Sequence, residues 1–406
     1  MRIRTWSDGI LLFSGCLLTF APLLRAEAQD VDVQGNVTMH DSTDSTVGNV
    51  LKEGVPFLHN FGFRNTFLGS NAGNVTMAGF SNTGAGAAAL TANSTGYENT
   101  AIGDSALASN STGDWNTAVG AQALLYNTTG NGNTAVGEIA LQYNSTGSNN
   151  TAIGSATLPN NRGSSNTAIG AFALDTNSTG SSNTANGTAA LSTNADGDYN
   201  TATGYNALAR NSTGGNRNTA TGAAALLSNT TGERNTALGY LADVSTGDLT
   251  NATAIGAGAI VDASDKIRFG NADVTVIEGQ VPYTYTSDRN KKENFQPMDP
   301  DDVLTKLRRL TVTSWNYKGQ DAKQFRHYGP MAQDFFAAFG RDAVGTIGTP
   351  TTITSGDLDG ILMIAVQALE KRTVEQEKQI GDLKAELKEI KRRVGGEVAA
   401  NVSAGL

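Results

Sequence analysis

The sequence predicts a mainly β fold: a parallel β-roll or solenoid of about twelve 17-residue repeats, then a small α+β domain and a C-terminal coiled-coil helix. Three observations support this prediction. One glycine recurs every 16 to 18 residues across 65–262, the chain turns abruptly basic at 285–295, and apolar residues follow a heptad spacing across 362–394. Each part of the chain therefore has its own sequence signature.

One glycine per unit gives the register of the repeat. These glycines are Gly69, Gly86, Gly103, Gly120, Gly137, Gly154, Gly170, Gly187, Gly204, Gly222, Gly239 and Gly256. Most units begin Asn-Thr-Ala-x-Gly, nine of twelve carry a leucine four residues after the glycine, and seven close with Asn-Ser-Thr-Gly or Asn-Thr-Thr-Gly. Each unit is expected to form one coil, with a short apolar strand, a second short strand around Ala-Leu, and polar turns. Stacked coils pair their strands in parallel.

The interior of such coils is expected to be narrow, because the repeated positions are mostly Ala, Gly and Thr. One stack then has too little large apolar volume to bury its faces alone. We therefore predict several chains sharing one core, as a parallel homotrimer. Asn186, Thr203 and Thr221 replace the usual Val, Ile or Leu before the glycine, and we expect them to weaken the packing locally.

The repeats at 65–262 resemble the head repeats of trimeric bacterial adhesins, although their period is longer. The resemblance implies a left-handed parallel β-roll. The Asn-x-Ser/Thr triplets formally match glycosylation sequons, but their strict place in the turns has a simpler structural cause. The roll is interpreted as a spacer or a binding surface, with a cell-surface receptor or a glycan as the candidate partner.

Composition excludes several classes of function. The formal net charge is -9 and no basic stripe is interleaved with aromatic residues, which argues against a nucleic-acid partner. Cys16 is the only cysteine, and His40, His59 and His327 lie far apart in the sequence. We therefore predict no metal site and no cofactor.

The N-terminus predicts a secretory signal peptide at 1–28. Arg2 and Arg4 precede the apolar stretch 10–24, and Ala26-Glu27-Ala28 is a small-residue cleavage site. The alternatives are a transmembrane anchor and a lipoprotein signal at Cys16. No later segment is apolar enough to span a bilayer, so we predict a secreted or cell-surface protein without a transmembrane anchor. Residues 29–64 are predicted to be an N-terminal tether.

A neck is predicted at 263–286, and the segment "YTSDRNKKENF" (285–295) follows its end. A serine becomes a useful nucleophile when a neighbouring group takes its proton, and a lysine serves when burial lowers its pKa. Ser287 and Lys292 are five residues apart across a bend and can meet. Alone, the pair is weak support for catalysis, because serine and lysine are often neighbours on surface loops.

Four ordered motifs add to this pair. They are Ser287 to Asn294, "VLTKLRRLTVTSWNYKG" (303–319), "HYGPMAQDF" (327–335) and "DLDGILMIAVQALEKR" (357–372). Together they resemble the endosialidase-type intramolecular chaperone family of tail fibres and spikes, over about 287–372. The resemblance implies a trimeric domain that assists assembly of a β-rich stalk and then cuts itself off.

The same resemblance implies residue roles. Ser287 would attack the carbonyl of Thr286 with Lys292 as general base, and His327 would be a supporting residue; a packed or turn histidine is the alternative reading of His327. Lys291 stands where an apolar residue is usual, which implies a less desolvated Lys292 and slower cleavage. The protein would thus be a single-turnover serine autoprotease acting on its own chain.

Helices are expected within and after this domain. Asp299-Pro300 is a good helix start, and Pro330 is expected to open a second helix that ends before Gly340. The heptad positions are Leu362, Val366, Leu369, Thr373, Gln376, Ile380, Leu383, Leu387, Ile390 and Val394. They predict a coiled-coil seam at 362–394 that nucleates the trimer, with Thr373 and Gln376 fixing its register.

The first functional hypothesis is a secreted trimeric fibre matured by autoproteolysis at Thr286–Ser287. The second is the same fibre with its C-terminal domain retained as an uncleaved trimerisation cap. The third is a surface adhesin, as the head repeats suggest.

Overall fold

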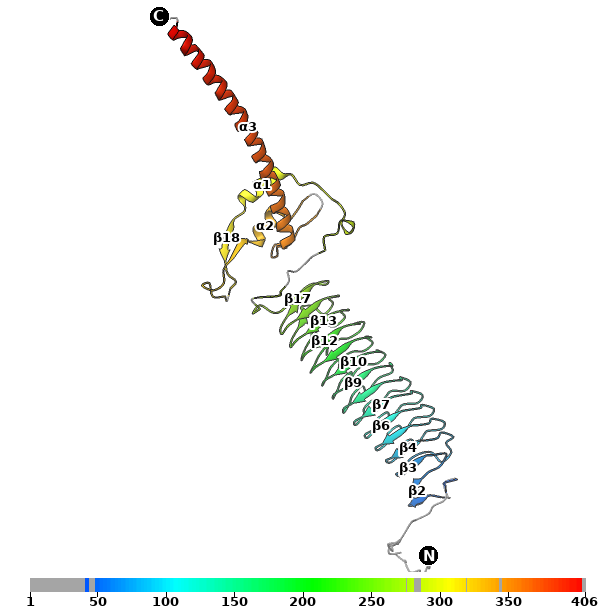
Figure 1. Ribbon diagram of the computed structural model, residues 1–406. Helices are drawn as coiled ribbons and strands as arrows, with labels where there is room; N and C mark the ends of the chain where they lie inside the picture. Colours follow the sequence, from blue (N-terminus) through cyan, green and yellow to red (C-terminus); the bar gives the residue numbers. More distant parts are fainter. Residues whose placement is uncertain are drawn as a thin grey trace, which may run out of the picture. The chain divides into compact units, whose positions relative to one another are not determined.

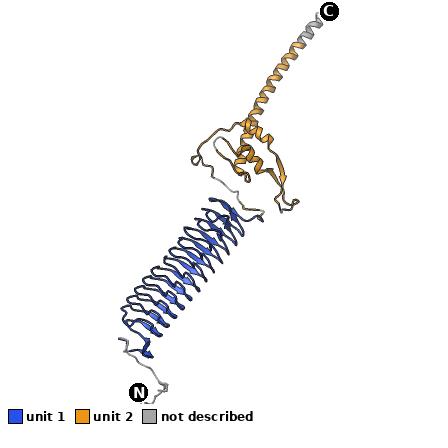
Figure 2. Cartoon of the chain, turned by 180° about the vertical axis from the view of Figure 1, so that it is seen from behind, with its two compact units in different colours: residues 1–273 blue, residues 274–406 orange. Residues whose placement is uncertain are grey.

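The computed structural model describes residues 41–43, 48–274, 276–280, 286–318, 320–342 and 345–403, the last nine of them in the backbone only. The chain divides into two compact units, with the boundary between Asp273 and Val274 (Figure 2). The predicted signal peptide at 1–28 and part of the predicted tether lie outside the described residues.

The first unit is a β-solenoid whose strands form a 15-stranded sheet in the order β1 to β13, β15 and β17 (Figure 1). The strands are β1 (Val50–Lys52), β2 (Val55–His59), β3 (Thr66–Leu68), β4 (Thr83–Ala85), β5 (Thr100–Ile102), β6 (Thr117–Val119), β7 (Thr134–Val136), β8 (Thr151–Ile153), β9 (Thr167–Ile169), β10 (Thr184–Asn186), β11 (Thr201–Thr203), β12 (Thr219–Thr221), β13 (Thr236–Leu238), β15 (Thr253–Ile255) and β17 (Ile267–Phe269). From β3 onward, neighbouring strands pair in parallel. The predicted solenoid of about twelve coils is confirmed.

The sheet extends beyond the repeat limits 65–262 at both ends. On the N-terminal side, β2 pairs antiparallel with β3 inside the range predicted as a tether. On the C-terminal side, β17 pairs in parallel with β15 inside the predicted neck, although it lacks the Thr-Ala motif. Backbone groups make the ladder, so a strand can add to the sheet without the repeat signature.

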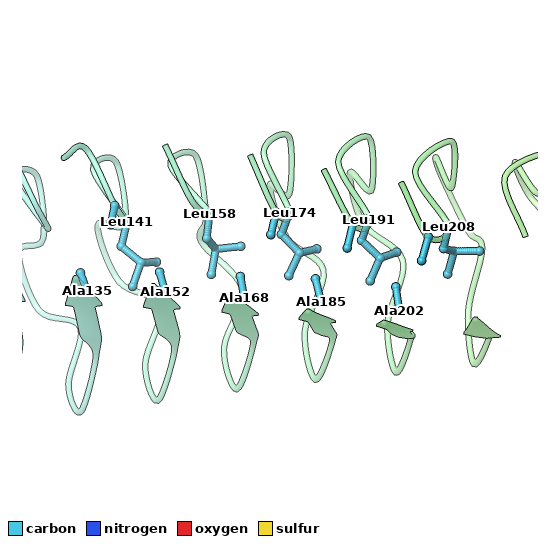
Figure 3. Packing of buried hydrophobic residues seen from close by; sticks show 14 of the residues in the cluster. Ala135, Leu141, Ala152, Leu158, Ala168, Leu174, Ala185, Leu191, Ala202 and Leu208 are labelled. Carbon is cyan, nitrogen blue, oxygen red and sulfur yellow. The ribbon is translucent and has the colours of Figure 1, made fainter. Parts of the chain in front are cut away.

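Each coil has its own apolar interior within a single chain. In β5 to β12 the central alanine points inward, and the leucine four residues after the glycine lies opposite it, as the labelled residues in Figure 3 show. Ala118, Leu124, Ala135 and Leu141 are all fully buried and belong to one continuous core. The expectation that several chains must share one core was therefore wrong for these residues, because alanine leaves room for one leucine per coil.

The second strand expected around Ala-Leu is absent from most of the described coils. Leu107 and Leu124 have φ angles of 51° and 52°, in the left-handed region that a β-strand does not use. Their N–H groups still bond the next coil, from Leu107 to Ala123 O at 3.0 Å and from Leu124 to Ala140 O at 2.9 Å. Only β14 (Asp243–Val244) and β16 (Ile260–Val261) pair as a second ladder. Burial of the leucine, worth about 2 kcal/mol, offsets a conformational cost of similar size.

Buried asparagines join each coil to the next. The backbone N–H and side-chain Nδ2 of Asn116 both donate to Asn99 Oδ1, at 3.0 and 3.1 Å, and Nδ2 also donates to Gly130 O at 2.9 Å. Asn133 N in turn donates to Asn116 Oδ1 at 3.0 Å. Because both sides of the amide are used, the first residue of Asn-Thr-Ala is a structural requirement of the stack.

A second asparagine ladder explains the sequons. Asn127 is fully buried, and its Nδ2 donates to Asn110 Oδ1 at 2.8 Å and to Gly130 O at 3.0 Å. The same arrangement recurs at the Asn of Asn-Ser-Thr-Gly in other coils. An amide that is enclosed and bonded in this way has no room for a glycan in the folded roll.

The substitution Asn116→Ala is expected to lower the free energy of unfolding by about 3 kcal/mol, because it leaves the buried Asn133 N–H without a partner and removes one of the two donors to Gly130 O. Thermal unfolding followed by circular dichroism measures the loss. Asn160→Ala is the control, since Asn160 is exposed and makes one long bond of 3.3 Å to Asp175 O. Equal losses in both variants would contradict the role of the ladder.

The residue that ends each strand points outward, opposite to the buried alanine. This outward column is aliphatic over β5 to β9, and Ile102, Ile153 and Ile169 are exposed in it. Asn186, Thr203 and Thr221 occupy the same outward column in β10 to β12, where the strands keep their parallel register. Their side chains do not face the interior, so the expected local weakening does not concern the core of the coil; for the outward face it stays a prediction.

The second unit contains α1 (Pro300–Arg309), β18 (Val312–Trp315), β19 (His327–Pro330), α2 (Ala332–Phe339) and α3 (Ser355–Ser403). Strands β18 and β19 form an antiparallel hairpin. The three helices share a core of Val303, Phe335, Phe339, Ile361 and Ala365.

Two helix starts were predicted in this unit. Asp299 caps α1, accepting a hydrogen bond from Asp301 N at 2.9 Å, with Pro300 in the first turn as expected. Pro330 instead ends β19, and α2 begins at Ala332, so the expectation for Pro330 was wrong. The N–H that proline lacks matters little at the last residue of a two-stranded hairpin.

Helix α3 is 49 residues long and includes the predicted seam. The apolar seam residues Leu362, Leu369, Leu383 and Ile390 are between 46% and 63% exposed in the single chain. Within the described part of the chain, no helix combines the length and the apolar character needed to cross a membrane.

Candidate functional site

The site at the start of the second unit is built on one short 3-10 turn, η1 (Arg289–Lys291). Asp288 caps this turn, with its side chain accepting a hydrogen bond from Asn290 N at 3.0 Å. Lys291 N donates to Asp288 O at 3.1 Å, and Lys292 N donates to Arg289 O at 3.2 Å. The Ser-Asp-Arg-Asn sequence thus reverses the chain between Ser287 and Lys292.

The reversal brings the two predicted catalytic side chains together. Lys292 Nζ donates a hydrogen bond to Ser287 Oγ at 2.7 Å. This distance is within the range over which a general base takes a proton from a nucleophile. Thr286, whose carbonyl belongs to the predicted cleavage bond, immediately precedes Ser287 and is exposed.

Solvent reaches the whole site in the single chain. Every residue from Thr286 to Met298 is exposed, including Ser287, Lys291 and Lys292. In the same segment, the Arg289 guanidinium lies over the Phe295 ring, 5.2 Å from the ring centre. No protein group therefore covers the Ser287–Lys292 pair within the described residues of this chain.

His327 lies at the start of β19, away from any hydrogen bond to the pair. It is opposite Trp315 in the β18–β19 hairpin, and the two rings stack with centroids 4.7 Å apart. Tyr317 contacts the same imidazole edge-on at 5.6 Å. The structure thus brings Ser287 and Lys292 together and places His327 in an aromatic cluster.

Two nitrogens in this aromatic cluster have no partner. His327 Nε2 and Trp315 Nε1 are buried and make no hydrogen bond with the described residues. Sequence reasoning identified His327 but not Trp315, although the pairing of a Val-Thr-aromatic strand with the His-x-Gly strand was a usable signal. Buried nitrogens without hydrogen-bond partners are costly unless another group meets them.

In the parts of the chain described above, no three His, Cys, Asp or Glu residues gather as metal ligands. The Ser287–Lys292 pair is suited to nucleophilic attack and proton transfer, neither of which needs a cofactor.

Comparison with known families agrees with the motifs. Residues 287–344 match the family model described as chaperone of endosialidase. This region is similar to the endosialidase chaperone domain. The match begins at Ser287 and includes η1, α1, the β18–β19 hairpin and α2. The resemblance drawn from the motifs is confirmed over this range, while the motif at 357–372 lies beyond it. A search of curated proteins gave no match to the chain.

Proposed function

We propose that the chain is a secreted, homotrimeric fibre or adhesin-like protein whose endosialidase chaperone domain promotes trimer assembly and then releases itself by cutting the Thr286–Ser287 bond. The observation that carries the proposal is the 2.7 Å hydrogen bond between Lys292 Nζ and Ser287 Oγ at the first residue of the matched domain. Ser287 follows the boundary between the two units, which is at 273–274, so a cut before it would release the matched domain from the roll.

The reaction uses the residues of the chain and one water molecule. Ser287 Oγ attacks the carbonyl carbon of Thr286 while neutral Lys292 takes the hydroxyl proton. Lys292 then gives this proton to the departing amine of Ser287, so that the peptide bond becomes an ester. Water hydrolyses the ester, which leaves a carboxylate on Thr286 and restores the Ser287 hydroxyl.

Cleavage is proposed to follow assembly. A lysine acts as a general base only after it loses its proton, and removal from water favours that loss. Both side chains are exposed in the single chain, and neighbouring copies are proposed to cover them. His327, whose Nε2 is buried and unpaired, is proposed to support the site in the assembled state.

Two exposed apolar surfaces support a homotrimer. One is the outward column of the sheet, with Ile102, Ile153 and Ile169, and the other is the seam of α3. Each would be covered by the same surface of another copy. The roll is proposed to be the mature product, acting as a spacer or as a surface for a receptor or glycan; the signal peptide at 1–28 is proposed to direct it out of the cell.

Expression of the full chain beside Ser287→Ala tests the proposal. Intact mass measured after full denaturation is expected to give two fragments that meet at Thr286–Ser287 for the natural chain. The variant is expected to stay whole, because the attacking oxygen is gone. Two intact chains that both form trimers would overturn autoproteolysis.

That second result would favour the alternative function, a fibre with a retained C-terminal trimerisation cap. The exposure of Lys292 and of the neighbouring Lys291 in the single chain is the observation that supports it. Under this alternative the chaperone domain aligns three chains and remains attached.

A further inference from the structure

Charged side chains flank the apolar seam of α3 on both sides. With Val366, Ile380 and Leu387 at heptad position a, and Leu369, Leu383 and Ile390 at position d, the flanking g positions hold Arg372, Gln379 and Glu386, and the e positions hold Glu377, Lys384 and Lys391. In parallel coiled coils, a g residue faces the e residue five positions later on the next helix, and these pairs select partners.

Several of these charges are unsatisfied within their own chain. Across the described side chains, Glu377, Glu386 and Lys391 form no ion pair. Glu386 has only Asp382 and Glu389 as charged neighbours one helical turn away, and both repel it.

Charges elsewhere on the same helix do find partners in the chain. Glu389 binds Arg392 at 2.8 Å and Arg393 at 3.1 Å. The lack of partners is therefore a property of particular flanking positions rather than of α3 as a whole.

We propose that these flanking charges bind a second copy of α3 that lies parallel and without axial shift. In this arrangement Arg372 faces Glu377 of the neighbouring copy, and Glu386 faces Lys391 of the neighbouring copy. Gln379, which is uncharged, faces Lys384 of the neighbouring copy. No like charges therefore meet in this arrangement. Arg372 also holds Asp301 of its own chain at 2.6 Å, and its five donors serve both carboxylates. The proposal rests on the proposed homotrimer and adds its orientation and register.

Other arrangements oppose like charges. A shift by one heptad in one direction sets Arg372 against Lys384. A shift in the other direction sets Arg393 against Lys391, although it pairs Arg372 with Glu370 and Glu386 with Lys384. Either shift also sets Thr373 and Gln376 against apolar positions of the neighbouring copy. An antiparallel copy with Ile380 facing Gln376 sets Glu377 against Glu377. The unshifted parallel arrangement also places the polar layers Thr373 and Gln376 against their own copies, where they do not interrupt an apolar layer.

The full chain carrying Ser287→Ala and Cys16→Ser tests the register, whether or not the natural chain is cut. Ile380→Cys and Leu387→Cys are each expected to form disulfides between identical positions, because a parallel, unshifted seam brings them together. Chains with Ile380→Cys and chains with Leu387→Cys, expressed together, are expected to give no mixed disulfide. A mixed disulfide would show a one-heptad shift and overturn the proposal.

Charge variants in the same chain test the pairs themselves. Glu386→Lys is expected to lower the trimer association constant about a hundredfold, because three pairs change sign at once, and adding Lys391→Glu is expected to restore it. Glu375→Lys is the matched control, with the same charge change on the outer side of the helix. Equal weakening by Glu375→Lys, or no rescue in the double variant, would overturn the pairing; trimers that form normally in every charge variant would overturn it while leaving the homotrimer intact.

Discussion

The substitution Lys292→Ala is expected to leave the chain uncut, whereas Lys291→Leu is expected to speed cleavage. Lys292 Nζ is the group that contacts Ser287 Oγ, at 2.7 Å, so its loss removes the base. General bases of this kind contribute about a hundredfold to ten-thousandfold in rate. Among the described residues, Lys291 makes no hydrogen bond to Ser287. Its charge keeps water molecules close to Lys292, and a leucine at this position would help to exclude that water.

The two variants differ by one position and both remove one positive charge, so each is the control for the other. The fraction of cut chain is measured over time by intact mass after expression and assembly. Cleavage that persists in Lys292→Ala, or that stops in Lys291→Leu trimers, would assign the proton transfer to another group.

The substitution Gly120→Ala is expected to disrupt the roll at one coil, at a cost of about 4 kcal/mol or more. Gly120 has a φ angle of 134°, and an added Cβ would lie 2.5 Å from Gly137 O and 2.6 Å from Gly137 C. Both atoms belong to the backbone of the next coil, which is held by the asparagine ladder and cannot move alone.

Gly214→Ala separates the two causes of this loss. Gly214 also has a positive φ angle, 75°, but an added Cβ there would meet nothing within 4 Å. We expect it to cost only about 1 kcal/mol, the conformational part. Unfolding midpoints measured by circular dichroism give the comparison, and similar midpoints for the two variants would rule out contact between coils as the reason for glycine.

The roll shows how far the sequence could predict the fold. The glycine period and the Thr-Ala-x pattern were sufficient for the number of coils and the parallel pairing, because these depend on the repeat itself. The conformation at Leu107 and Leu124 was not predictable, because leucine rarely takes a positive φ angle. Contacts with neighbouring coils impose it, and such contacts exist only once the coils are stacked.

The site divides in the same way. The approach of Ser287 and Lys292 was predictable from their spacing and from Asp288 at the start of the turn, since all of these are local. The aromatic surroundings of His327 depend on the pairing of β18 with β19 across a long loop, so the ring stack with Trp315 required the structure. Exposure of the serine and lysine also could not be deduced, because it depends on what the rest of the chain leaves uncovered.

The asparagine ladders have a consequence for how such a protein changes length. Asn99, Asn116 and Asn133 bond only within their own coil and to the coils directly before and after it, and the Leu–Ala core repeats with the same period. Removal or duplication of one complete coil therefore gives every remaining coil the kind of neighbour it had before. The length of the roll can therefore change in uniform steps of one coil, by evolution or by engineering, without any change to the first or the last coil.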